Sequence, residues 1–190
     1  FSIGAMATLR DIEKHEGLNT YTRGAVANAV KDIVGVQFRN MATVGGSIWG
    51  RFGFSDVLTV FLAMDSYVEL YKGGIIPLEQ FAKMKKDNDI LVRLIVKKTP
   101  CKVVYTAMRN QSTDFPVLAC AVSYMNGQYR ASIGARPARA ILLQSEKAEG
   151  FAEFVAKNAP TEGNIRGSAA YRTHLIRVLV ERCITELGGM

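Results

Sequence analysis

One short stretch in the first third of the chain combines side chains suited to binding a phosphate-bearing ligand. Gly45 and Gly46 lack Cβ atoms, so their backbone can take positive φ angles and approach such a ligand closely. Thr43 and Ser47 flank this pair with hydroxyls that can donate to phosphate oxygens, and Asp56 follows as an acceptor for sugar hydroxyls. The stretch therefore predicts half of a nucleotide site, although a glycine pair by itself is also typical of an ordinary turn.

The composition is that of a globular chain. Its 190 residues are 48% hydrophobic and 22% charged, which is enough to bury one sizeable core or two small lobes. The longest apolar runs, such as 117–122, are too short to cross a bilayer, and no charged leader with an apolar core stands at the N-terminus. We therefore expect a soluble, cytoplasmic protein.

The cysteines and histidines do not indicate a disulfide framework or a metal site. Cys101, Cys120 and Cys183 are widely spaced and odd in number, which is typical of core thiols. His15 and His174 lie far apart, without further ligands at metal-binding spacing. No Ser-His-Asp or Cys-His spacing indicates a catalytic set of side chains.

The net charge of +7, from 24 Lys and Arg against 17 Asp and Glu, predicts an anionic partner. The basic residues are scattered, and their densest cluster, over 83–102, lacks the interleaved aromatic residues of a single-strand nucleic-acid platform. An RNA-binding domain is a minor alternative, and it would bind with an affinity that falls steeply with salt. We expect no nucleic-acid partner.

Hydrophobic periodicity predicts an α+β fold with the glycine-containing stretch between two helices. A polar loop at 86–89 divides a helix-rich half, 1–86, from a half with an antiparallel sheet and helices, 87–190. Asn126-Gly127 predicts a tight hairpin turn. Helices are expected over 8–15, 22–34, 57–64, 146–157 and 168–187, and strands over 1–5, 67–72, 90–96, 102–108, 116–125 and 128–134.

Four motifs follow one another along nearly the whole chain. They are residues 3–9, residues 39–48 continued by Ser55-Asp56 and 63–65, residues 133–139, and residues 166–172. In this order they resemble the FAD-binding (medium) subunit of molybdenum hydroxylases, such as xanthine dehydrogenase and carbon monoxide dehydrogenase. The resemblance favours a nucleotide site over a simple turn at the glycine pair.

The resemblance also implies a division of the fold. Residues 1–86 would form the second subdomain of a PCMH-type FAD-binding domain, and 87–190 a domain like the C-terminal domain of the CO dehydrogenase flavoprotein. Relatives carry a preceding lobe whose own glycine-rich loop holds the FAD pyrophosphate. Because the chain begins after that lobe, we expect a fragment with an incomplete FAD site.

The function implied is electron transfer within a multi-subunit oxidoreductase. A large molybdopterin-binding subunit would oxidise the substrate, a small subunit with [2Fe-2S] clusters would relay the electrons, and FAD would pass them to NAD or another acceptor. The chain would place and tune FAD without a catalytic side chain of its own, and would be inactive alone. The alternative is a non-catalytic assembly module of the same fold that has lost FAD.

The resemblance assigns roles to individual residues. Asp56 matches an acidic residue that binds FAD hydroxyls, and it is also suited to stabilising a helix N-terminus. Trp49 replaces a smaller apolar residue, so it would either stack on FAD or crowd it. The second cofactor loop falls on Thr43, Gly45, Gly46 and Ser47, which would contact the pyrophosphate and adenosine side.

Two further residues are assigned in the second half. Leu91 matches an apolar residue that packs on the flavin ring, with a core leucine as the alternative. Arg109 would supply a cation near the flavin, unless a two-residue shift in register places Ala107 there instead. Four arginines of the C-terminal motifs are expected to form contacts within the domain first and to dock an acidic surface second: Arg136, Arg139, Arg166 and Arg172.

Overall fold

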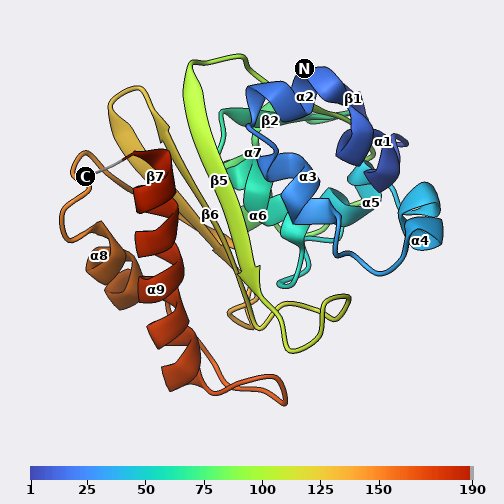
Figure 1. Cartoon of the computed structure of the whole chain (residues 1–190). Coiled ribbons are helices and arrows are strands. Elements are labelled where there is room, and N and C mark those ends of the chain that lie inside the picture. Colours follow the sequence, from blue (N-terminus) through green and yellow to red (C-terminus); the bar gives the residue numbers. More distant parts are fainter. Residues whose placement is uncertain (189–190) are drawn as a thin grey trace.

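The computed structural model describes residues 1–188 and has an α+β architecture with two four-stranded antiparallel sheets (Figure 1). The strands are β1 (Ser2–Gly4), β2 (Ser66–Leu70), β3 (Gly74–Pro77), β4 (Leu91–Val96), β5 (Cys101–Met108), β6 (Leu118–Met125), β7 (Gln128–Gly134) and β8 (Ile141–Ser145). The helices are α1 (Leu9–Lys14), α2 (Glu16–Tyr21), α3 (Ala25–Val30), α4 (Val36–Met41), α5 (Val44–Trp49), α6 (Asp56–Leu62), α7 (Leu78–Lys83), α8 (Phe151–Asn158) and α9 (Ala169–Leu187).

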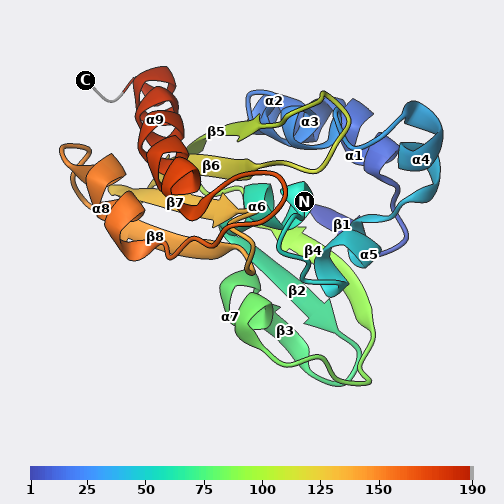
Figure 2. The same cartoon turned by 90° about the horizontal axis from the view of Figure 1, so that it is seen from below.

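The first sheet has the strand order β1-β4-β2-β3 (Figure 2). Strand β4 pairs antiparallel with both β1 and β2, so it lies inside this sheet. A boundary at 86/87 would separate β4 from the strands that satisfy its backbone hydrogen bonds. The two sheets therefore divide the chain after β4, later than the sequence suggested.

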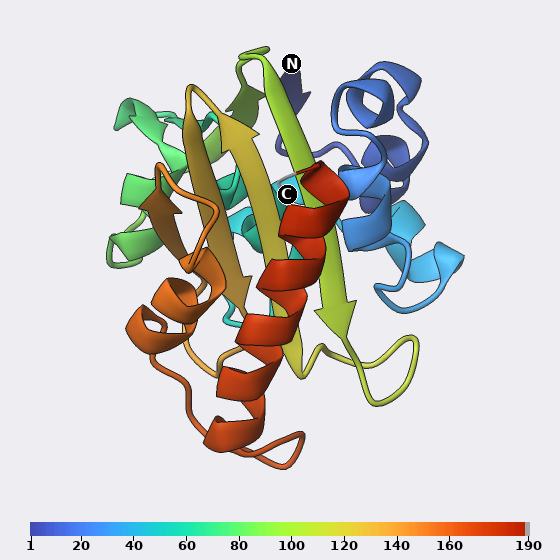
Figure 3. The same ribbon diagram turned by 60° about the vertical axis from the view of Figure 1, so that its left-hand side comes forward.

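The second sheet has the order β5-β6-β7-β8 and separates two hydrophobic clusters. Helices α8 and α9 cover one face (Figure 3), and the helices of the N-terminal half cover the other. The β6–β7 connection is the tight hairpin expected, because Asn126 and Gly127 have φ angles of 51° and 77°. All of β6 except Tyr124 is buried, which explains its nearly continuous apolar sequence.

Helix α6 lies at the centre of the molecule, and every one of its residues is buried. It passes so close to β7 that a Cβ on Gly134 would lie 2.2 Å from the Thr59 hydroxyl oxygen. Ser55 caps the helix by accepting a hydrogen bond from the Leu58 amide at 3.1 Å. This helix therefore places Asp56, its first residue, in the interior.

Several boundaries differ from those expected. The helix expected over 22–34 is confined to α3, because Arg23 and Gly24 take φ angles of 51° and 80° that separate it from α2. Helix α8 begins at Phe151 instead of 146, after Gly150 with a φ angle of 70°. The described residues 1–188 contain no helix both long and apolar enough to cross a membrane.

The glycine pair lies in helix α5, so the expected positive φ angles were wrong. Gly45 is needed for close packing: a Cβ there would lie 2.7 Å from both the Cβ and the carbonyl oxygen of Ala5. A Cβ on Gly46 would meet only the Thr43 hydroxyl oxygen, at 3.2 Å. The two glycines therefore serve different purposes, and only Gly45 is required by its neighbours.

We predict that Gly45→Ala lowers the free energy of unfolding by about 1–2 kcal/mol, because overlap with the Ala5 backbone outweighs the better helix propensity of alanine. Gly46→Ala is the matched control, and its stability should be unchanged or rise by up to about 1 kcal/mol. Urea unfolding of both variants measures the difference. Equal stability of the two variants would contradict the packing role of Gly45.

The thiols differ in burial. Cys120 and Cys183 are buried, as core thiols should be, whereas Cys101 is partly accessible. Burial raises the pKa of the Cys101 thiol to about 11. Since the thiolate is the reactive form, low reactivity is expected even at the accessible position.

Iodoacetamide at pH 8 should therefore alkylate Cys101 on the order of 100-fold more slowly than a free cysteine with an ordinary pKa of about 8.5. Cys120 and Cys183 should react only after denaturation. Mass spectrometry of the intact protein over time gives these rates. Rapid single labelling of the native protein would show that Cys101 is not desolvated.

Candidate functional site

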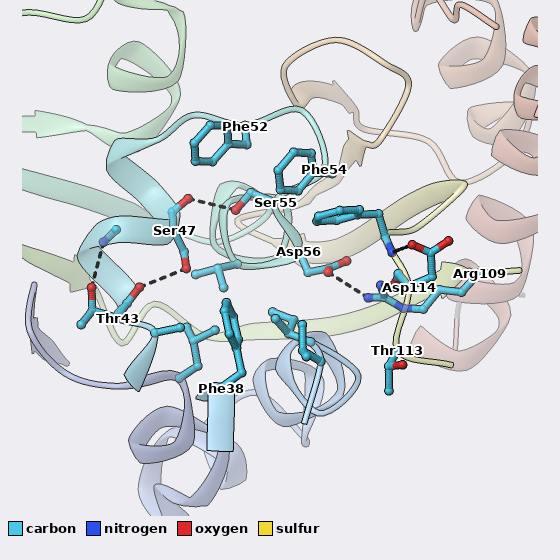
Figure 4. A pocket seen from close by; sticks show the side chains of 17 residues that line it. Phe38, Thr43, Ser47, Phe52, Phe54, Ser55, Asp56, Arg109, Thr113 and Asp114 are labelled. Carbon is cyan, nitrogen blue, oxygen red and sulfur yellow. Dashed lines mark hydrogen bonds and ion pairs between the residues drawn. The ribbon is translucent and has the colours of Figure 1, made fainter. Parts of the chain in front are cut away.

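A pocket of about 470 Å³ opens between α4, α5, the segment leading into α6, and the loop that follows β5 (Figure 4). Its wall is mainly apolar, with polar side chains contributed by α5, by the start of α6 and by the loop after β5. This combination is typical of small-molecule sites. The polar lining residues are Thr43, Ser47, Ser55, Asp56, Arg109, Thr113 and Asp114, and the aromatic ones are Phe38, Phe52, Phe54 and Phe115.

Three hydroxyls on this wall are oriented by local hydrogen bonds, and two of them belong to the helix caps Thr43 and Ser55. Thr43 caps α5, where its Oγ1 accepts a hydrogen bond from the Gly46 amide at 3.1 Å. The Ser47 hydroxyl donates to the Thr43 carbonyl at 3.0 Å, and the Ser55 hydroxyl donates to the Ser47 carbonyl at 3.0 Å. Within residues 1–188 the Thr43 hydroxyl donates to no acceptor, so its proton is available to a ligand.

Asp56 is 4% exposed and is held by two donors. Tyr105 donates a hydrogen bond to its Oδ1, and the Arg109 guanidinium lies 2.8 Å from its Oδ2. Burial raises the pKa of Asp56, while Arg109 and Tyr105 act in the opposite direction. Each carboxylate oxygen keeps a further lone pair, so Asp56 can still accept a hydrogen bond from a ligand hydroxyl.

Arg109 joins the two sides of the pocket. Its side chain is 9% exposed, and besides Asp56 it binds the Asp114 carbonyl oxygen, to which it donates at 2.6 Å. Burial opposes its charge, but the Asp56 carboxylate outweighs that effect and raises the pKa of Arg109. The guanidinium of Arg109 therefore lies at the pocket, where it is paired with the carboxylate of Asp56.

The amides of the glycine pair are not directed at the pocket. The Gly45 amide donates to the Ala5 carbonyl at 2.8 Å, and the Gly46 amide donates to the Thr43 side chain. The Ser47 amide donates to the Thr43 carbonyl at 3.1 Å. In this conformation the Thr43 hydroxyl, and not the amides, is the donor that the segment offers to a ligand.

Three residues assigned to the site, Gly45, Trp49 and Leu91, do not line the pocket. Trp49 packs on Phe81, with ring centroids 5.8 Å apart, and lies against Arg51. Leu91 is 7% exposed and belongs to the core of the first half, which is the alternative considered for it. The pocket thus brings together Thr43, Gly46, Ser47, Asp56 and Arg109 from the expected set, without Gly45, Trp49 or Leu91.

The aromatic side chains were not foreseen from the sequence. The Phe52 and Phe54 rings stack with their planes 5° apart, and the ring centroids of Phe54 and Phe115 lie 4.3 Å apart. These three rings and Phe38 are each between 41% and 49% exposed. The available signal was the pattern Phe52-Gly53-Phe54 immediately before the helix cap, which puts large apolar residues in an irregular segment.

The arginines of the C-terminal motifs make contacts within the chain. Arg136 donates to the carbonyls of Arg139 and Pro160, and Arg139 donates to those of Ala82 and Met84. Arg166 forms an ion pair with Asp114, and the buried Arg172 donates to three carbonyls. Arg136, Arg166 and Arg172 therefore make the expected contacts within their own half, whereas Arg139 contacts the first half of the chain. Docking of an acidic surface stays a prediction.

Comparison with known proteins identifies the first half of the chain. The model of the family described as "FAD binding domain in molybdopterin dehydrogenase" matches residues 1–98. This match ends just after β4, where the first sheet also ends. Among curated proteins, the chain is 26% identical over 185 residues to "Uncharacterized protein YgfM" of Escherichia coli K12, covering 94% of this chain and 69% of that protein.

Solved structures share the fold over essentially the whole chain. Quinoline 2-oxidoreductase from Pseudomonas putida 86 matches with a TM-score of 0.81 and 17% identity, over 100% of this chain and 75% of that chain. Carbon monoxide dehydrogenase from Hydrogenophaga pseudoflava matches with a TM-score of 0.81 and 20% identity, over 97% of this chain and 73% of that chain. These matches confirm the expected α+β class, and the sequence match establishes that the chain belongs to the family of FAD-binding domains of molybdopterin dehydrogenases.

Proposed function

We propose that this chain is the flavin-binding, electron-transferring part of a multi-subunit molybdopterin-dependent hydroxylase. Electrons would reach FAD from iron–sulfur clusters in a small partner subunit and leave to NAD or another acceptor. Molybdopterin would be held by a large partner subunit, where the substrate is oxidised. Membership of the FAD-binding family supports the flavin role, and similarity to subunits of oxidoreductases supports the class of complex.

The observation that carries the proposal is the juxtaposition of hydroxyls, a buried carboxylate and half-exposed aromatic rings in one pocket. The Thr43 hydroxyl can donate to an anionic oxygen, and Asp56 can accept from a sugar hydroxyl. The phenylalanine rings offer flat apolar surface to a planar ring system. These groups fit FAD, which when bound would supply the redox chemistry.

The protein's own contribution is binding and electrostatics. Arg109 places a permanent positive charge next to the pocket, and a cation near a flavin favours forms of the ring that carry negative charge. Asp56 neutralises part of that charge, so the pair sets the local field. We propose no side chain as a proton donor or nucleophile.

A second candidate is an assembly module that keeps the fold without binding FAD. One observation favours it: the amides of residues 45–47 and both oxygens of Asp56 already have partners inside the protein. The half-exposed phenylalanines would then contact a partner protein. The two candidates differ in whether the purified chain binds FAD.

We predict that the purified chain binds added FAD, which is measured by the quenching of FAD fluorescence. Phe54→Ala should weaken this binding about 2- to 12-fold, because losing an aromatic contact costs about 0.5–1.5 kcal/mol. Phe154→Ala is the matched control, because Phe54 and Phe154 are 41% and 42% exposed and Phe154 lies on α8, outside the pocket. Its affinity should equal that of the wild type.

The outcome separates the candidates. If the wild-type chain does not quench the fluorescence of added FAD, the assembly module is favoured. If FAD binds but both phenylalanine variants lose affinity equally, the ligand does not occupy this pocket. Parallel thermal unfolding of each variant checks that the fold is intact.

A further inference from the structure

The loop after β5 forms the wall of the pocket opposite α5. Residues Arg109, Thr113, Asp114 and Phe115 of this loop all line the pocket. The loop has no regular secondary structure between β5 and β6. Its conformation must therefore be fixed by contacts with other parts of the chain, and those contacts decide how the wall is presented to a ligand.

Arg166, from the segment between α8 and α9, makes the ion-pair contact to this loop. Its NH2 lies 2.9 Å from Asp114 Oδ1 and its Nε lies 3.3 Å from Asp114 Oδ2, which is a two-point geometry. Its guanidinium also lies 5.2 Å from the centroid of the Phe115 ring. The hydrogen bonds from Arg166 lower the pKa of Asp114. Arg166 itself does not line the pocket.

The contact continues into the pocket. The carbonyl of Asp114, whose side chain binds Arg166, accepts a hydrogen bond from Arg109, and Arg109 in turn pairs with Asp56. Arg166 is thus linked through Asp114 to the buried ion pair of Arg109 and Asp56. Through Phe115 it is linked to the ring of Phe54. An ion pair near the surface contributes little to stability, but a two-point pair combined with a cation–π contact can fix the geometry of a loop.

The fold around Arg166 is held by a different residue. Arg172 is 1% exposed and donates to the carbonyls of Val117, Glu162 and Gly167 and to the side chain of Asn164. These bonds anchor the segment that carries Arg166 and the end of the loop at β6. Loss of the Arg166 side chain therefore leaves the segment in place.

We propose that Arg166 is a positioning residue of the ligand pocket, which holds Asp114 and Phe115 so that the C-terminal half of the chain completes a site begun by the FAD-binding half. This inference rests on the proposed function for the identity of the ligand. It assigns a role in the site to a part of the chain beyond the matched residues 1–98.

The test compares Arg166→Gln with Arg177→Gln. Arg177 pairs with Glu153 at 2.6 Å on the helical face of the same half, so both variants lose one positive charge and one ion pair. Arg166→Gln should weaken FAD binding about 3- to 10-fold and speed exchange of the Asp114 and Phe115 amide hydrogens, which are hydrogen-bonded within the loop, about 10-fold. Arg177→Gln should do neither. Arg166→Lys should restore binding only in part, because lysine lacks the two-point geometry.

Two measurements keep the inference separate from the proposed function. Unchanged hydrogen exchange and unchanged FAD affinity in Arg166→Gln would overturn the positioning role while leaving FAD binding intact. If the wild-type chain binds no FAD, the proposed function fails, and hydrogen exchange of the loop still decides whether Arg166 positions it. An increase in exchange spread over the whole chain would show a general loss of stability and also overturn the inference.

Discussion

The burial of the Asp56 carboxylate between Tyr105 and Arg109 is the interaction on which the site depends. A buried carboxylate is costly unless it is paired and hydrogen-bonded, and here one partner comes from inside β5 and the other from its end. Because Asp56 opens the central helix α6, this contact joins the helical half to the second sheet. The pocket forms at this junction.

From that junction the polar contacts extend outward. Arg109 connects Asp56 to the loop after β5, and the loop is held by Arg166 and Arg172 from the C-terminal motifs. Motifs that lie more than 100 residues apart in the sequence thus act on one pocket. Ser55 links α5 to α6 in the same way, so the Thr43 and Ser47 hydroxyls are placed relative to Asp56 by backbone contacts.

Part of the site could be predicted from residues that are neighbours in the sequence. The Ser55-Asp56 pair before an apolar run indicated a helix start, and Asp56 does open α6. Helix α5 and its Thr43 cap were not expected. The helical conformation of Gly45 could not be predicted, because it depends on packing against Ala5, 40 residues earlier in the sequence. The phenylalanine side chains of the pocket were also not predicted, since the exposure of Phe115 depends on how its loop folds against Arg166. The membership of β4 in the first sheet depends on pairing with β1, which sequence periodicity does not encode.

Photoaffinity labelling with an azido derivative of FAD tests most directly whether this pocket is the flavin site. Peptide mapping should find the adducts within 34–56 and 109–115, the segments that carry most of the lining residues. An excess of unmodified FAD should prevent the labelling. Adducts on α8 or α9, or labelling that FAD does not compete with, would contradict the assignment of the pocket.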